Sequence, residues 1–228
     1  MSKLGAFVRL DFVTVKPYFS VKYMLIYAAL AIYMTIMSKN IGSSVGIGLM
    51  LATLSLGYPF AFAEKCNMDA LYATLGADRK TVVRGRYIFS LLLDVCAIVF
   101  VMAFSLIAMV ITRIYSGFEG VLVESLGATL ALSMLFMIIQ SAQIPLYFKL
   151  GYAKAKFFSI LPFFLISAFI GFFIMNAQGS GMPEGVNAFV QSLVSNGFAL
   201  AAAIIVLLAA VLFVSYKLSL AFYKKREF

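Results

Sequence analysis

The chain has 228 residues, of which 64% are hydrophobic and 12% charged, and its formal net charge is +9. A composition so rich in apolar side chains indicates a protein whose main solvent is lipid. The sequence contains no histidine and only two cysteines, which excludes Ser–His catalysis, histidine-bound zinc and a cysteine cage for a metal. We therefore expect no catalytic site in this chain, and no metal or cofactor bound by it.

The positive charges are distributed unevenly along the chain. Six apolar stretches are long enough to cross a hydrocarbon core of about 30 Å as helices. Of the 18 Lys and Arg residues, 16 fall in the segments that these stretches place on one common side. Segments that retain Lys and Arg stay in the cytoplasm, so we expect both termini inside. The same distribution accounts for the net charge without a nucleic-acid partner.

We predict an all-α integral membrane fold with one transmembrane domain, residues 1–228. No strand-like alternation recurs at the spacing typical of a membrane barrel. The six spans are expected near Val21–Met37, Gly42–Ala63, Tyr87–Ile111, Ser125–Leu146, Phe157–Met175 and Phe198–Tyr216.

The first 20 residues precede the first span and carry an apolar stripe flanked by basic residues. Asp11 interrupts this stripe, and Pro17 marks its end or a kink. Such a segment suits a helix that lies along the membrane surface.

The segment Glu64–Arg86 is the longest cytoplasmic connection and contains a second amphipathic pattern. Met68, Leu71, Tyr72 and Leu75 recur at the spacing of one helix face. They predict a short helix outside the membrane. On this pattern alone, the helix either packs beneath the bundle or binds a partner, and the two alternatives stay open.

Polar residues set the expected ends of this short helix. Asn67 can cap its start, Asp69 lies favourably in its first turn, and Gly76 can end it. Asp78 is then a good N-cap for a second helix that continues into the third span.

Three polar residues are expected at membrane depth. Asp94 lies about two turns into the third span, where an ionisable side chain is a functional candidate by default. A structural partner such as Arg84 or Arg86 is the alternative. Gln140 and Gln143, in the fourth span, are expected to hydrogen-bond a neighbouring helix.

Residues 176–197, between the fifth and sixth spans, are expected outside the cell. A glycine-rich break is followed by apolar residues at helical spacing. This pattern predicts a short helix that is either re-entrant or an ordinary surface helix.

The sequence LYATLGADRKTVVRGRY resembles a motif of the permease subunits of type 2 ABC exporters. The likeness is strongest to the small bacterial branch that includes exporters of phenol-soluble modulins and antimicrobial peptides. Gly76 stands where that motif usually has proline. The matching residues are Glu64, Leu71, Leu75, Asp78, Arg79, Lys80, Val83, Arg86 and Tyr87.

The resemblance implies a function for residues 64–86. Met68–Leu75 would be the coupling helix that docks in a groove of a separate ATPase subunit, with Arg79 and Lys80 at the rim. The implied complex has two permeases, as a homodimer or a heterodimer of close paralogues, and two ATPase subunits that bind ATP and Mg²⁺. It would lie in the bacterial cytoplasmic membrane, in contact with lipid, and export an amphipathic peptide or lipid-like substrate.

Two other functions remain open from the residues. A gradient-driven secondary transporter usually has several ionisable groups inside the membrane, and here Asp94 is the one candidate. A non-transporting membrane scaffold or immunity protein would need no such groups.

Overall fold

The computed structural model describes residues 3–39, 41–74, 78–112, 118–158, 160–165, 168 and 197–225. Within these ranges all regular structure is helical, as the apolar spans and the lack of strand-like alternation predict. The elements are α1 (Lys3–Val15), the 3₁₀ helix η1 (Lys16–Phe19), α2 (Val21–Ser38), α3 (Ile41–Ser55), α4 (Tyr58–Lys65), α5 (Met68–Thr74), α6 (Arg79–Thr112), α7 (Phe118–Phe158) and α10 (Gly197–Lys224).

Five stretches of the described chain are long and apolar enough to cross a membrane. They are Val21–Ser38, Ile41–Lys65, Arg79–Ile111, Ser125–Phe158 and Ile205–Lys224. These stretches correspond to the first four and the last of the predicted spans. About half of the remaining one, Phe157–Met175, lies outside the described residues, so the count of six stays a prediction.

The second span is interrupted, which the hydropathy pattern did not predict. α3 ends at Ser55, and α4 begins at Tyr58 with Pro59 in its first turn. Proline is tolerated there because the first N–H groups of a helix have no partner within it. Pro59 and Gly57 therefore divide the predicted Gly42–Ala63 helix into two.

The fourth span extends well beyond its predicted end at Leu146. α7 continues through Pro145 to Phe158, with a kink at Gly151, where φ is 75° and ψ is 170°. A side chain would be strained in this conformation, so glycine is the residue that permits the change of direction.

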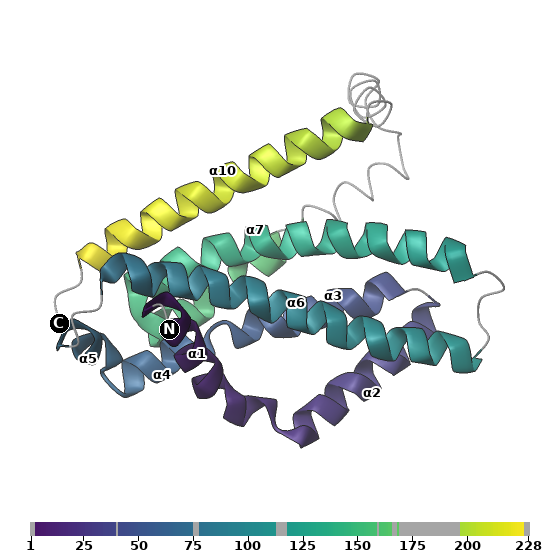
Figure 1. Cartoon of the computed structure of the whole chain (residues 1–228), viewed down its shortest axis with the longest axis horizontal. Coiled ribbons are helices and arrows are strands. Elements are labelled where there is room, and N and C mark those ends of the chain that lie inside the picture. The colour runs from purple at the N-terminus through teal and green to yellow at the C-terminus, as the bar shows by residue number, and fades with distance from the viewer. Residues whose placement is uncertain are drawn as a thin grey trace.

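Figure 1 shows α6 and α7 running along the long axis of the molecule, with α10 packed against α7 toward its C-terminal end and diverging from it toward its N-terminal end. α3 packs against both α6 and α7. α2 contacts α3 near its C-terminal end and diverges from the bundle toward its N-terminal end (Figure 1). Hydroxyl groups hold the contact, because Thr35 and Ser44 bond to each other at 2.7 Å and Ser44 donates to the Ala31 carbonyl at 3.0 Å.

α1, α5 and the C-terminal end of α10 gather at one end of the molecule (Figure 1). A cluster of buried apolar side chains joins them there, and it includes Val15, Tyr72, Val83, Phe148 and Tyr223. α1, α5 and the C-terminal end of α10 therefore share one end of the described bundle. That this end is cytoplasmic remains a prediction.

Candidate functional site

The short helix predicted in the 64–86 connection is present as α5, which begins at Met68, directly after Asn67, as predicted. Asn67 has a left-handed backbone with φ of 47°, whereas an N-cap residue is extended. Its carbonyl oxygen still accepts a hydrogen bond from the N–H group of Leu71. Leu75 and Gly76, the predicted end of the helix, lie outside the described residues.

The apolar face of α5 is divided between the interior and the surface. Tyr72 is 5% exposed, and its ring lies 4.5 Å from the ring of Phe7 on α1. Burial raises the pKa of Tyr72 to about 12. Met68 is half-buried against the same cluster, whereas Leu71 is 47% exposed. Leu71 is therefore the apolar side chain that α5 presents outward.

Asp69 and Arg79 connect α5 and α6 to the end of α10. The Tyr223 hydroxyl donates to Asp69 Oδ1 at 3.1 Å. Arg79 Nη1 donates to the carbonyl oxygens of Tyr223, at 3.0 Å, and Lys224. The last carbonyls of a helix have no partner within it, so Arg79 satisfies the end of α10. Both residues hold the loop in place rather than facing outward.

Glu64 also makes contacts within the chain. Its Oε2 accepts hydrogen bonds from the backbone N–H groups of Tyr152 and Ala153. These groups follow Gly151 and begin the second part of α7, so the Glu64 carboxylate caps that helical segment from α4. The sequence pattern gave no sign of this contact across 88 residues.

Asp78 and Lys80 remain at the surface of this end. The carbonyl oxygen of Asp78 accepts hydrogen bonds from the N–H groups of Thr81 and Val82, which is the backbone arrangement of an N-cap. The prediction that Asp78 precedes α6 is therefore confirmed. Both side chains are exposed.

A buried ion pair fixes α1 to α6. Arg86 Nη1 donates to Asp11 Oδ1 at 2.7 Å, with the two side chains 3% and 1% exposed. Arg86 also donates to the Pro59 carbonyl at 3.3 Å and lies over the Phe60 ring. Burial raises the pKa of the Asp11 carboxyl, and the charge of Arg86 opposes that rise.

Arg86, which the sequence suggested as a partner of Asp94, therefore pairs with Asp11 instead. Asp94 is 2% exposed, and its Oδ1 accepts a hydrogen bond from Gln140 Nε2 at 2.7 Å. The same Nε2 lies 3.1 Å from Thr53 Oγ1. The polar cluster therefore joins α6, α7 and α3, and the expectation that Gln140 bonds a neighbouring helix is confirmed. Gln143 is buried nearby on α7.

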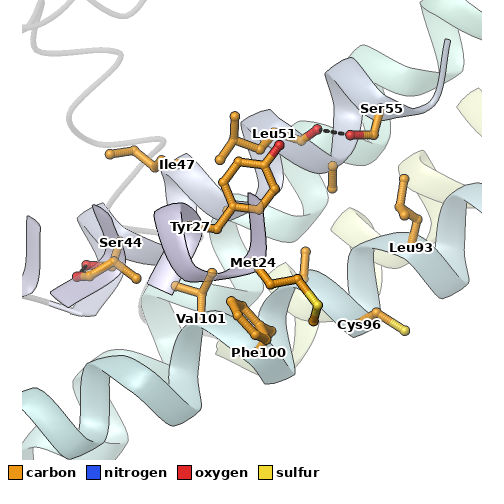
Figure 2. Close-up of a pocket in the computed structure, with 14 residues that line it drawn as sticks. Met24, Tyr27, Ser44, Ile47, Leu51, Ser55, Leu93, Cys96, Phe100 and Val101 are labelled. Atoms are coloured by element: carbon orange, nitrogen blue, oxygen red, sulfur yellow. Dashed lines mark hydrogen bonds between the residues drawn. The ribbon is translucent and has the colours of Figure 1, made fainter. Parts of the chain in front are cut away.

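A cavity of about 150 Å³ lies where α2 diverges from α3 and α6. Figure 2 shows the side chains that line it, with Met24 and Tyr27 from α2, Leu51 from α3, and Cys96 and Phe100 from α6. Its walls are almost entirely apolar. A cavity of this kind accepts hydrocarbon more readily than a polar group, because a polar group would lose its bonds to water there.

Five apolar spans in the described part of the chain, a buried polar cluster and a loop helix packed against α1 and α10 point to a multi-pass membrane protein. Comparison with known proteins is more specific. A family model described as an ABC-2 family transporter protein matches residues 7–224. The chain therefore belongs to the ABC-2 transporter family. No curated protein and no solved structure matches it. Family membership implies a permease that works with an ABC ATPase.

Proposed function

We propose that this chain is the membrane-spanning permease subunit of an ATP-driven exporter. It moves a hydrophobic or amphipathic substrate out of a bacterial cell across the cytoplasmic membrane. A peptide is the substrate that we favour. A separate ATPase subunit binds ATP and Mg²⁺ and hydrolyses the ATP, and the permease itself is not an enzyme.

The observation that carries this proposal is that α5 exposes one apolar side chain while other side chains attach it to α1 and α10. Leu71 faces outward from it, while Tyr72 holds it to Phe7 of α1 and Asp69 holds it to Tyr223 of α10. An ATPase that binds the exposed side of α5 therefore acts on a helix already fixed to other parts of the bundle.

A movement of α5 would be passed on to the helices within the membrane. The chain passes from α5 to α6, which runs without interruption from Arg79 to Thr112. α6 is also joined to α1 by the buried pair of Arg86 and Asp11. Packed helices of this kind move as units rather than bending. Closure of the ATPases would thus shift α1, α6 and α10 together.

The complex is proposed to contain two permeases and two ATPase subunits. A single chain of this size offers a poor conduit, so pairing two copies, or two close paralogues, places the substrate path along their seam. α1, α5 and the C-terminal end of α10 lie at one end of the molecule (Figure 1), which would put both ATPases on the same side of the membrane.

The apolar cavity supports the proposed substrate class. Met, Phe and Tyr side chains line it (Figure 2), and methionine adapts to varied apolar shapes. Within the described residues the cavity has no charged lining residue. An amphipathic peptide can offer apolar side chains to such walls, whereas a bare ion cannot.

The direct test is purification of the tagged chain from its own host, followed by reconstitution in liposomes. We expect ATP hydrolysis to accompany the chain, and its rate to rise when a synthetic amphipathic helical peptide is added. A preparation without ATP hydrolysis, whose transport follows a proton or sodium gradient, would contradict the proposal and favour a secondary transporter.

A further inference from the structure

A second cavity, of about 330 Å³, lies between α6, α7 and α10. It is open on one side and has a different set of walls from the cavity of Figure 2. Apolar side chains such as Leu91, Ile144 and Phe213 form most of its surface. Its volume falls within the range of about 300–1,000 Å³ that is typical of small-molecule sites.

Arg84 is the one charged residue among the described residues that line this cavity. It lies on α6 less than two turns from the start of that helix at Arg79. Its guanidinium is exposed, and within the described chain no carboxylate pairs with it. Arg79 and Arg86, its neighbours on α6, both have partners inside the protein. Arg84 is therefore a cation available to a ligand.

Several of the polar groups near Arg84 are already occupied. The Tyr87 hydroxyl is bonded to Ser215 and Ser219. Ser90 Oγ donates to the Tyr87 carbonyl at 2.8 Å, and the Gln140 amide nitrogen donates to Asp94. A ligand in the cavity would thus find apolar walls and one cation, at the end of the bundle where α1 and α5 lie.

We propose that this cavity binds an anionic phospholipid of the inner leaflet, with an acyl chain between α6, α7 and α10 and the phosphate on Arg84. Basic pockets between transmembrane helices on the cytoplasmic side suit anionic headgroups, and the guanidinium can bond phosphate oxygens at two points. Free phosphate lacks the tail that the walls need, and a zwitterionic lipid lacks the net charge. The site goes beyond ATP-driven transport and does not depend on it.

The bound lipid has a structural consequence. Phe213 and Tyr216 of α10 and Leu91 of α6 all line the cavity, so an acyl chain there would contact both helices. Lipid binding therefore raises the free energy of unfolding, because a ligand that binds only the native state stabilises that state.

Native mass spectrometry of the purified chain in detergent, titrated with phosphatidylglycerol or phosphatidylcholine, tests the proposal. We expect tighter binding of phosphatidylglycerol and a higher Tm in its presence. Arg84→Gln should weaken phosphatidylglycerol binding about ten-fold, the loss expected for a charge-assisted hydrogen bond. It should weaken phosphatidylcholine binding less, because the choline cation already opposes the charge of Arg84, so the preference between the two lipids should shrink. Lys80→Gln removes an exposed cation of the same helix that does not line the cavity, and it should keep the preference.

Two further experiments test whether the site needs a lipid tail and whether the tail lies in the cavity. Inorganic phosphate should give no rise in Tm, and an equal rise would indicate a free-anion site instead. Leu91→Trp, which fills the cavity at a partly exposed position, should weaken the binding of both lipids while Arg84 remains. Equal binding of the two lipids by the wild type, or equal loss in the Arg84 and Lys80 variants, would overturn the proposal. Should Arg84→Gln fail to fold, Arg84→Lys keeps the charge and should retain most of the preference, and its loss would count against the site.

Discussion

At the residue scale, the buried pair of Asp11 and Arg86 determines how the N-terminal helix is attached. The two residues are 75 positions apart in the chain, and neither pattern nor charge count in the sequence pairs them. Asp11 looked like an interruption of an apolar stripe. In the structure, that interruption is the point at which α1 is fastened to α6.

We expect removal of either partner alone to destabilise the chain strongly. Asp11→Ala leaves the Arg86 guanidinium buried without its carboxylate, and breaking a buried pair in this way costs about 3–5 kcal/mol. The double variant Asp11→Leu, Arg86→Met removes both charges, and its loss should be much smaller. Thermal unfolding in detergent measures both. A loss below about 1 kcal/mol in the single variant, within the range of exposed pairs, would show that the pair is not buried in the membrane protein.

At the element scale, close helix contact depends on small residues. A Cβ added at Gly48 of α3 would lie 2.5 Å from Val101 Cγ2 on α6, whereas one at Gly46 would meet Leu132 at an ordinary 3.7 Å. Transmembrane helices associate largely through packing that small residues permit. Gly48 therefore sets the distance between α3 and α6.

Gly48→Ala should lower the stability of the chain by about 1–3 kcal/mol, the usual cost of overpacking. Gly46→Ala lies two residues away on the same helix and should be neutral or slightly stabilising, because alanine favours helix more than glycine. The Tm values of the two variants in detergent check this. Equal Tm values would mean that α3 and α6 do not approach each other as closely as described.

The element scale also shows what the sequence could and could not predict. Helical periodicity predicted α5, and the spacing of Asp78 from the third span predicted the start of α6. Periodicity places Leu71 and Tyr72 on one face of α5, but it does not say which neighbour covers which residue. Phe7, more than 60 positions away, covers Tyr72 and leaves Leu71 exposed. Hydropathy likewise treats α3 and α4 as one span, because Gly57 and Pro59 barely change a window average.

The partners of the charged loop residues depend on tertiary structure for the same reason. The resemblance grouped Glu64, Asp69 and Arg79 with residues that couple to an ATPase. Their actual partners, on α7 and α10, come from segments that a local pattern cannot place. Asp94 and Gln140 were both identified as polar residues at membrane depth. Their hydrogen bond could not be predicted, because it depends on how α6 and α7 pack against each other.

At the scale of the whole molecule, the topology follows from where the basic residues lie. We expect a cysteine introduced at Glu184 to react with an impermeant thiol reagent in intact cells, and one at Lys224 to be protected until the cells are opened. A background with Cys66→Ser and Cys96→Ser removes the two exposed native thiols. Protection at Glu184 together with labelling at Lys224 would reverse the orientation and place α5 outside.

The central claim is that the exposed side of α5 docks an ATPase subunit, and Leu71 tests it most directly. Leu71→Asp places a carboxylate in an apolar groove of the partner, at a cost of several kcal/mol, enough to reduce association by orders of magnitude. Leu71→Met keeps the apolar contact and serves as control. Tyr72 is unsuitable for this test, because a change there disturbs the contact with Phe7.

The measurement is the ATP hydrolysis rate that accompanies the purified chain, compared between the wild type and these two variants at equal membrane insertion. The account predicts that Leu71→Asp inserts normally but loses nearly all of the accompanying hydrolysis, while Leu71→Met retains it. Normal hydrolysis with the Leu71→Asp variant would contradict the account and leave α5 as a helix that only supports the bundle.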